Sequence, residues 1–216
     1  HNVCVMNTPG QNSNAVAELV FGLLVFGVRN FYNGTSGIEL KGKKLGILAY
    51  GNVGRNVARI AKGFGMEVYA YDAFCPAAAI EADGVKAVAS TKALFETCQI
   101  VSLHIPATAE TKGSINAELM GAMPKGAILV NTARKEVMDE AALTQVLADR
   151  PDFKYLTDVM PAIHPELAEK FAGRYFSTPK TMGAQTAEAN INAGIAAASQ
   201  IVDFIVNGNE KFKVNR

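Results

Sequence analysis

Tryptophan is absent from this sequence, and cysteine and net charge are both scarce. The three cysteines, Cys4, Cys75 and Cys98, are odd in number and widely separated, so they form none of the paired spacings typical of zinc or redox sites. No metal site is expected, and a reducing cytoplasmic location fits best. The formal net charge of +1 gives no long-range field that would attract nucleic acid or an anionic membrane. Small metabolites are therefore the expected partners.

Long hydrophobic runs are also few. The most apolar window, Ala15 to Val28, contains Glu18 and is followed by Arg29, so it is too short and too interrupted to span a bilayer. It predicts a buried helix instead. We expect no basic, serine-rich leader, and the apolar run Val3 to Met6 at the start is typical of an internal fragment.

What the sequence has in abundance is short apolar runs that alternate with helical patterns, in a chain of 216 residues that is 49% hydrophobic and long enough to bury a core. Short apolar strands between helices predict an α/β fold with a doubly wound parallel sheet. The expected strands are Lys44 to Leu48, Glu67 to Tyr71, Ile100 to His104, Ala127 to Val130 and Tyr155 to Asp158, and the expected helices between them are Asn52 to Gly63, Lys92 to Thr97, Ala117 to Met123 and Glu140 to Ala148.

Two long helices, at residues 13–30 and 186–206, are expected to flank this sheet within one domain of residues 1–206, followed by a surface tail at 207–216. The first is apolar on nearly every side, which predicts burial by the sheet on one face and by another chain or domain on the other. The second predicts one stripe that faces the protein, formed by Ile191, Ile195, Ala198, Val202 and Ile205.

A variant of the glycine-rich dinucleotide fingerprint follows the first strand and opens a helix, which is the context that this motif requires. Its residues are Ala49-Tyr50-Gly51-Asn52-Val53-Gly54. Gly51 would let the backbone approach a pyrophosphate, and Gly54 would allow close packing of helix on strand. Ala49 replaces the first glycine, which weakens the motif without excluding it. The candidate cofactor-binding residues here are Gly51, Asn52, Val53 and Gly54.

Asp72 ends the second expected strand, 18 positions after Gly54. A carboxylate there can accept hydrogen bonds from the adenosine ribose hydroxyls, and its charge would repel a ribose phosphate, so NAD is preferred over NADP. The pattern favours a Rossmann-like NAD site. The alternative is a tight glycine turn capped by an aspartate, with no ligand.

From Val5 onward the chain resembles the D-2-hydroxyacid dehydrogenases, and among them it is most similar to the short phosphoglycerate dehydrogenases. The matching blocks run in order through nearly the whole chain. They are Met6 to Gly10 with Ala15 to Glu18, Ala49 to Gly54 with Asp72, Ser102 to Pro106, Thr111 to Gly113, Asn131 to Arg134, Asp158-Val159, Thr178-Pro179 and Gly183-Ala184.

This resemblance implies roles for residues near the nicotinamide. Arg134 would hold the substrate carboxylate in two parallel hydrogen bonds and polarise the carbonyl, unless it is an ordinary surface arginine. Asp158 would meet the nicotinamide carboxamide, with Ala133 and Gly183 close by, although it could instead cap a strand. The resemblance also implies that His104 lies near the adenosine half in a structural role. Thr111 to Gly113 would form a structural turn.

The chain departs from the family where most members carry a histidine oriented by a glutamate. The glutamate position reads Ile163 without a gap or His164 with one inserted residue, and Lys180 stands where the histidine would be. A subgroup of phosphoglycerate dehydrogenases resembles this chain in that lysine, so we take Lys180 as the acid/base, with His164 ranked second. A lysine pKa near 10.4 must fall to roughly 7–8 for this task. The alternative is that Lys180 attracts a substrate phosphate or lies in solvent.

The implied reaction is NAD-dependent hydride transfer at C2 of a small D-2-hydroxy acid, with 3-phosphoglycerate, the substrate of the first step of serine synthesis, as the leading candidate. Glyoxylate, hydroxypyruvate or another 2-keto acid is the alternative within the enzyme class, and a non-catalytic NAD-binding module is the alternative outside it. Family members also have an N-terminal substrate domain, which would precede Val3 and is not expected in this chain. They dimerise through the nucleotide-binding domain, so we expect a homodimer.

Overall fold

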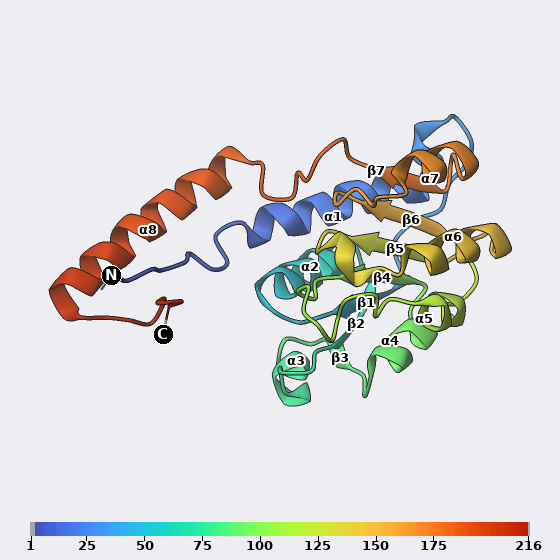
Figure 1. Cartoon of the computed structure of the whole chain (residues 1–216). Coiled ribbons are helices and arrows are strands. Elements are labelled where there is room, and N and C mark those ends of the chain that lie inside the picture. The colour runs from blue at the N-terminus through green and yellow to red at the C-terminus, as the bar shows by residue number, and fades with distance from the viewer. Residues whose placement is uncertain (1–2, 216) are drawn as a thin grey trace.

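Residues 3–215, which the computed structural model describes, are built on a parallel sheet of seven strands in the order β3-β2-β1-β4-β5-β6-β7 (Figure 1). The expected boundaries at residues 1 and 216 lie outside this range. The strands are β1 (Lys44–Leu48), β2 (Glu67–Tyr71), β3 (Lys86–Ala87), β4 (Ile100–Leu103), β5 (Ile128–Asn131), β6 (Lys154–Thr157) and β7 (Tyr175–Ser177). All six neighbouring pairs are parallel, which confirms the doubly wound sheet.

Helices cover both faces of the sheet. One core cluster contains α1 (Ser13–Val28), α2 (Asn52–Gly63) and α3 (Ala77–Ala82), and the other contains α4 (Thr91–Thr97), α5 (Ala117–Ala122), α6 (Glu140–Asp149) and α7 (His164–Lys170). Along β1 the burial alternates between them, since Leu45 and Ile47 belong to the first cluster and Leu48 to the second. Strands buried on both faces are apolar at nearly every position, which is why these runs were visible in the sequence.

Edge elements are where the sequence-based prediction fell short. Strands β3 and β7 and helices α3 and α7 were not predicted. The two strands have only two and three residues, which is too short a stretch to show a periodic pattern. Strands β4, β5 and β6 each begin or end one residue away from the predicted bounds. Two short 3-10 turns, η1 (Asn30–Tyr32) and η2 (Lys135–Val137), complete the connections.

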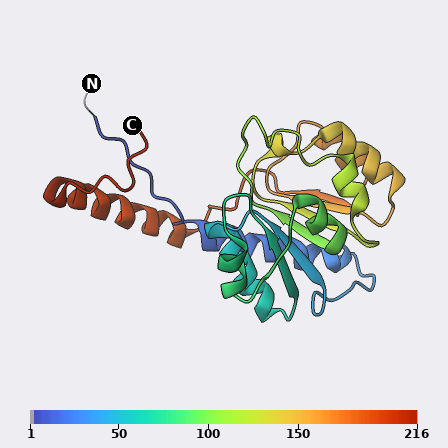
Figure 2. The same ribbon diagram turned by 90° about the horizontal axis from the view of Figure 1, so that it is seen from below.

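Helix α8 (Ala187–Asn207) corrects a prediction. Ile191, Ile195, Val202 and Ile205 were expected to face the protein, yet each is more than half exposed, and Ala198 is exposed as well. The reason is visible in Figures 1 and 2, where α8 extends away from the sheet and the helices that cover it. Helix α1, in contrast, has eight buried residues and packs on α2, β5 and β6, as expected for the face towards the sheet.

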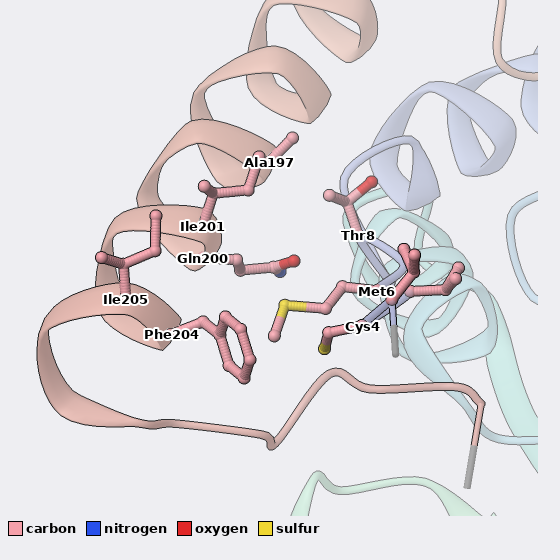
Figure 3. Close-up of a pocket in the computed structure, with 10 residues that line it drawn as sticks. Cys4, Met6, Thr8, Ala197, Gln200, Ile201, Phe204 and Ile205 are labelled. Atoms are coloured by element: carbon pink, nitrogen blue, oxygen red, sulfur yellow. The ribbon is translucent and has the colours of Figure 1, made fainter. Parts of the chain in front are cut away.

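The two ends of the described chain lie together beside α8 (Figure 2). Met6 forms an antiparallel bridge with Lys213, and the tail turns back at Gly208, which adopts a left-handed φ of 67°. A cavity of about 580 Å³ separates the N-terminal segment from α8, and its apolar lining includes Met6, Ile201 and Phe204 (Figure 3). By length and composition alone, α8 is also apolar enough to cross a bilayer, although such a helix is weak evidence for a membrane span.

Candidate functional site

The glycine turn lies at the centre of the sheet, where β1 ends and α2 begins. Ala49 takes a left-handed φ of 78°, a conformation that costs a residue with a side chain roughly 1–2 kcal/mol and explains why the motif prefers glycine there. A Cβ at Gly54 would lie 2.4 Å from the Ala49 carbonyl oxygen and 3.1 Å from the Ile47 side chain. A Cβ at Gly51, the N-cap of α2, would meet nothing within 4 Å. Gly54 therefore serves packing, and Gly51 keeps an open approach to the helix N-terminus.

Asp72 follows β2 and is bound to the same turn. Its Oδ2 accepts a hydrogen bond from the Tyr50 N–H (2.6 Å), and its Oδ1 accepts from the N–H groups of Phe74 (2.7 Å) and Cys75 (2.9 Å). Burial by itself raises the pKa of Asp72, but these three donors and the nearby Arg55 outweigh it and lower the pKa below its usual value. The carboxylate is thus held ionised beside the glycine turn, with capacity left to accept from a ribose hydroxyl.

A cavity of about 770 Å³ joins these features. It is lined by the glycine turn, by Asp72 to Phe74 after β2, by the His104–Thr111 region after β4, and by Gly10, Asn12 and Ser13 at the start of α1. Among the described residues that line it there is no lysine or arginine, and two, Asp72 and Glu110, are acidic. Phosphate binding would therefore depend on backbone N–H groups at the α2 N-terminus. A further phosphate beside Asp72 would be disfavoured.

The residues after β4 shape one wall of this cavity. His104 shares a hydrogen bond of 2.9 Å with the Ser102 hydroxyl, and burial lowers its pKa to about 3, so the ring is neutral near pH 7. Thr111 donates to the Pro106 carbonyl (2.5 Å), and Gly113 adopts a left-handed φ of 65°. These contacts agree with the structural roles expected for His104 and for the turn at Thr111 to Gly113.

At the other end of the site, Asp158 follows β6 and is buried. Its Oδ2 accepts hydrogen bonds from the N–H groups of Met182 (3.0 Å) and Gly183 (2.7 Å), whereas its Oδ1 is buried without a hydrogen-bond partner among the described residues. A Cβ at Gly183 would lie 3.2 Å from the Asp158 carboxylate. The structure therefore brings Asp158 and Gly183 together, as predicted.

Ala133 lies after β5, the neighbour of β6, in a loop that Asn131 shapes. The Asn131 side chain accepts from the Ala133 N–H (3.0 Å) and donates to the Arg134 carbonyl (3.0 Å) and the Tyr155 hydroxyl (3.2 Å). Sequence reasoning gave Asn131 no role of its own. An amide residue directly after an apolar run was the sequence feature that could have indicated this role. The β5–β6 register, which pairs Asn131 with Thr157, sets Ala133 and Asp158 at adjacent strand ends.

The three proposed catalytic residues are less closely assembled. Arg134 is exposed, and its Nη1 donates to the Ala133 carbonyl (2.8 Å). Lys180 is exposed too, and its carbonyl accepts from the Thr178 hydroxyl (2.6 Å). His164 begins α7, where its Nδ1 lies 2.8 Å from the Tyr175 hydroxyl. Within residues 3–215 no hydrogen bond joins any one of these three to another.

The arrangement fits a dinucleotide. Asp72 follows β2 and Asp158, with its orphaned Oδ1, follows β6. These strands lie four places apart in the sheet, which corresponds to about 19 Å at roughly 4.8 Å per strand. Between them lie the glycine turn and the helix N-terminus, where the chain order reverses, and open α/β sheets bind their ligands at such a point.

Comparison with known proteins agrees with this geometry. Residues 27–179 match the family described as D-isomer specific 2-hydroxyacid dehydrogenase, NAD binding domain. The D-3-phosphoglycerate dehydrogenase of Haemophilus influenzae is 35% identical over 230 residues, which cover 98% of this chain and 55% of that protein. The hydroxypyruvate reductase of Thermotoga maritima is 35% identical over 214 residues, covering 91% of this chain and 68% of that protein.

Among solved structures, the cofactor (NAD+) bound 3-phosphoglycerate dehydrogenase in Entamoeba histolytica has a TM-score of 0.90 and 48% identity, covering 99% of this chain and 68% of that one. The chain spans about half the length of the Haemophilus influenzae relative. The family match covers more than half of this chain, and the glycine turn and Asp72 lie within it. The chain therefore belongs to the D-isomer specific 2-hydroxyacid dehydrogenase family and contains the NAD binding domain of that family.

Proposed function

We propose that this chain is the cofactor-binding part of an NAD-dependent oxidoreductase that transfers a hydride between the nicotinamide and C2 of a small D-2-hydroxy acid, with 3-phosphoglycerate as the substrate. The names of the Haemophilus influenzae and Entamoeba histolytica relatives support this reaction and substrate. Bound NAD would supply the nicotinamide ring that accepts or gives the hydride.

The orphaned oxygen of Asp158 carries the proposal. A buried carboxylate oxygen without a hydrogen-bond donor is unfavourable, and such an atom in a folded protein calls for a partner. A carboxamide NH₂ group is a donor of the right kind. The Met182 and Gly183 N–H groups fix the other carboxylate oxygen, so Oδ1 is already oriented to accept.

An Asp158→Asn variant tests this role. The new amide can still accept from the Met182 and Gly183 N–H groups through its oxygen, but its NH₂ then occupies the position that should accept. We expect NADH to bind about tenfold more weakly, whereas ADP-ribose, which has no nicotinamide, binds as to the wild type. Equal loss for both ligands, or no loss for NADH, would contradict the assignment.

For the substrate, we propose that Arg134 holds the carboxylate and that Lys180 moves the proton on and off the C2 oxygen. We rank His164, whose Nδ1 lies 2.8 Å from the Tyr175 hydroxyl, second to Lys180 for this step. A Lys180→Met variant should lose turnover and keep NADH binding, and a His164→Ala variant should keep both. Turnover retained in Lys180→Met would refute the role.

The hydroxypyruvate reductase of Thermotoga maritima, also 35% identical, favours a second candidate, reduction of glyoxylate, hydroxypyruvate or a similar 2-keto acid. A substrate panel followed by NADH absorbance separates the two, since 3-phosphoglycerate with NAD should give the highest kcat/KM under the first proposal. Binding of NADH without turnover of any substrate would instead identify a non-catalytic NAD-binding module.

We further propose a cytoplasmic homodimer whose protomers associate through the nucleotide-binding domain, with a substrate domain ahead of Val3 covering the exposed apolar stripe of α8. The greater length of the relatives and the exposed Ile191, Ile195 and Ile205 side chains support this organisation. Sedimentation equilibrium of the protein would test the dimer, because a monomer at all concentrations is incompatible with it.

A further inference from the structure

Phe74 is the most exposed large hydrophobic side chain among residues 3–215, with 95% of its surface accessible. It comes two residues after Asp72 and lines the cofactor cavity. A phenyl ring left in water loses the favourable free energy of burial, and nothing in the packing of the fold requires an aromatic residue at this position. The ring is therefore available to a ligand that enters the cavity.

The backbone that carries this ring is fixed. The Phe74 N–H donates to Asp72 Oδ1 at 2.7 Å, and the Cys75 N–H donates to the same oxygen at 2.9 Å. The second oxygen of Asp72 accepts from the Tyr50 N–H of the glycine turn at 2.6 Å. One carboxylate thus holds residue 74 at a set position relative to the turn, beside the group that would accept the adenosine ribose hydroxyls.

Residues that follow β4 form a second wall of the cavity. Strands β2 and β4 are the two neighbours of β1, so the segments after them flank the glycine turn on either side. Ile105 and Pro106 after β4, and Leu119 on α5, line the same cavity as Phe74. These side chains are uncharged and His104 beside them is neutral, so this end of the cavity suits a flat heteroaromatic ring.

We propose that Phe74 stacks on the adenine base of the dinucleotide and provides affinity at its adenosine end. This inference rests on the proposed NAD-dependent function. The nicotinamide is excluded as the stacking partner because Asp158, which would bind it, follows β6, a strand four places away from β2 in the sheet.

Ligand fragments test the proposal on a Phe74→Ala variant. We expect NADH and ADP-ribose to bind about fivefold to twentyfold more weakly, the lower part of the range for loss of base–aromatic stacking, and nicotinamide mononucleotide to bind unchanged. The melting temperature should not move, because the side chain is 95% exposed. Tyr32→Ala, which removes another exposed aromatic ring outside the cavity, is the matched control and should leave all three affinities unchanged.

The outcomes distinguish failure of the stacking role from failure of the proposed function. If the wild type binds neither NADH nor ADP-ribose, the proposed function itself fails. If the wild type binds both and Phe74→Ala binds ADP-ribose equally well, only the stacking role is overturned. A loss of affinity for nicotinamide mononucleotide as large as that for ADP-ribose would also overturn it.

The absence of tryptophan from the sequence allows a direct readout of contact. In a Phe74→Trp variant the introduced indole is the sole tryptophan, and ADP-ribose, which does not absorb its emission, quenches it only through contact. We expect saturable quenching in Phe74→Trp and none in Tyr32→Trp. Unquenched emission of Phe74→Trp at saturating ADP-ribose would overturn the proposal.

Discussion

Two glycines of the same turn should respond differently to the addition of one methyl group. Gly51→Ala should lose cofactor affinity and keep its stability, whereas Gly54→Ala should lose stability. Gly51 has a negative φ of −83°, and a Cβ there meets no atom within 4 Å. Replacing an N-cap glycine by alanine weakens the cap, but it also reduces the entropy of the unfolded chain by an opposing amount of about 0.4–1 kcal/mol. The free energy of unfolding of Gly51→Ala should therefore stay within about 0.5 kcal/mol of the wild type.

Cofactor binding by Gly51→Ala should nevertheless be poor. Gly51 lines the cavity, so the methyl group takes the space through which a pyrophosphate approaches the N-terminus of α2. Losing one charge-assisted hydrogen bond costs about 1.5–3 kcal/mol, which corresponds to roughly 10- to 150-fold weaker NADH binding.

Gly54→Ala should instead lose stability. Its Cβ would lie 2.4 Å from the backbone oxygen of Ala49, which cannot move without shifting the turn. Such overpacking costs about 1–3 kcal/mol, and for a chain of this length each kcal/mol lowers the melting temperature by about 2–4 °C. The expected decrease is about 2–12 °C.

Thermal unfolding without ligand and titration with NADH measure the two effects separately. Gly63→Ala is the matched control, because Gly63 ends the same helix, lies outside the cavity lining and leaves open space for a Cβ. It should keep NADH affinity and gain up to about 1 kcal/mol of stability. Normal NADH binding by Gly51→Ala, or an unchanged melting temperature for Gly54→Ala, would refute the division of roles.

Three further substitutions give independent tests. Ala49→Gly removes the cost of a left-handed alanine and should raise stability by about 0.5–1 kcal/mol after the added entropy of the unfolded chain, and a lower melting temperature would contradict this. Asp72→Asn should bind NADH about tenfold more weakly, and the ratio of its affinities for NADH and NADPH should be smaller than in the wild type. Parallel titrations of both cofactors would detect these changes. The pKa of His104 is near 6.5 when unfolded and about 3 when folded, so its stabilising contribution is present above pH 6.5 and is lost as the pH falls towards 3. In urea titrations, the free energy of unfolding of the wild type should fall by up to about 2 kcal/mol between pH 6.5 and about 5, and that of His104→Gln should fall by less. An equal fall in the two proteins would argue against this assignment.

Much of the sheet could be predicted because its central strands are buried on both faces, which leaves a short apolar run in the sequence for each. The glycine turn and Asp72 could be found for a similar reason. Their geometry depends on a strand, a turn and a helix that are consecutive in the chain, so spacing alone indicates which residues meet.

The environments of α8 and Asp158 could not be predicted. The periodic apolar stripe of α8 is present in the sequence, but periodicity shows only that one side of a helix is apolar, not that this chain covers it. The orphaned oxygen of Asp158 depends on the loop at Met182 and Gly183, more than twenty residues later, which satisfies one carboxylate oxygen and leaves the other.

The sequence by itself determined the alternation of strands and helices, the glycine turn and the acidic residue that follows β2, because these are periodic or short-range properties of the chain. Only the tertiary structure decided which polar atoms lie buried without a partner, which apolar faces stay exposed and which loops line one cavity. Those properties depend on contacts between segments far apart in sequence, and packing, not local pattern, sets such contacts.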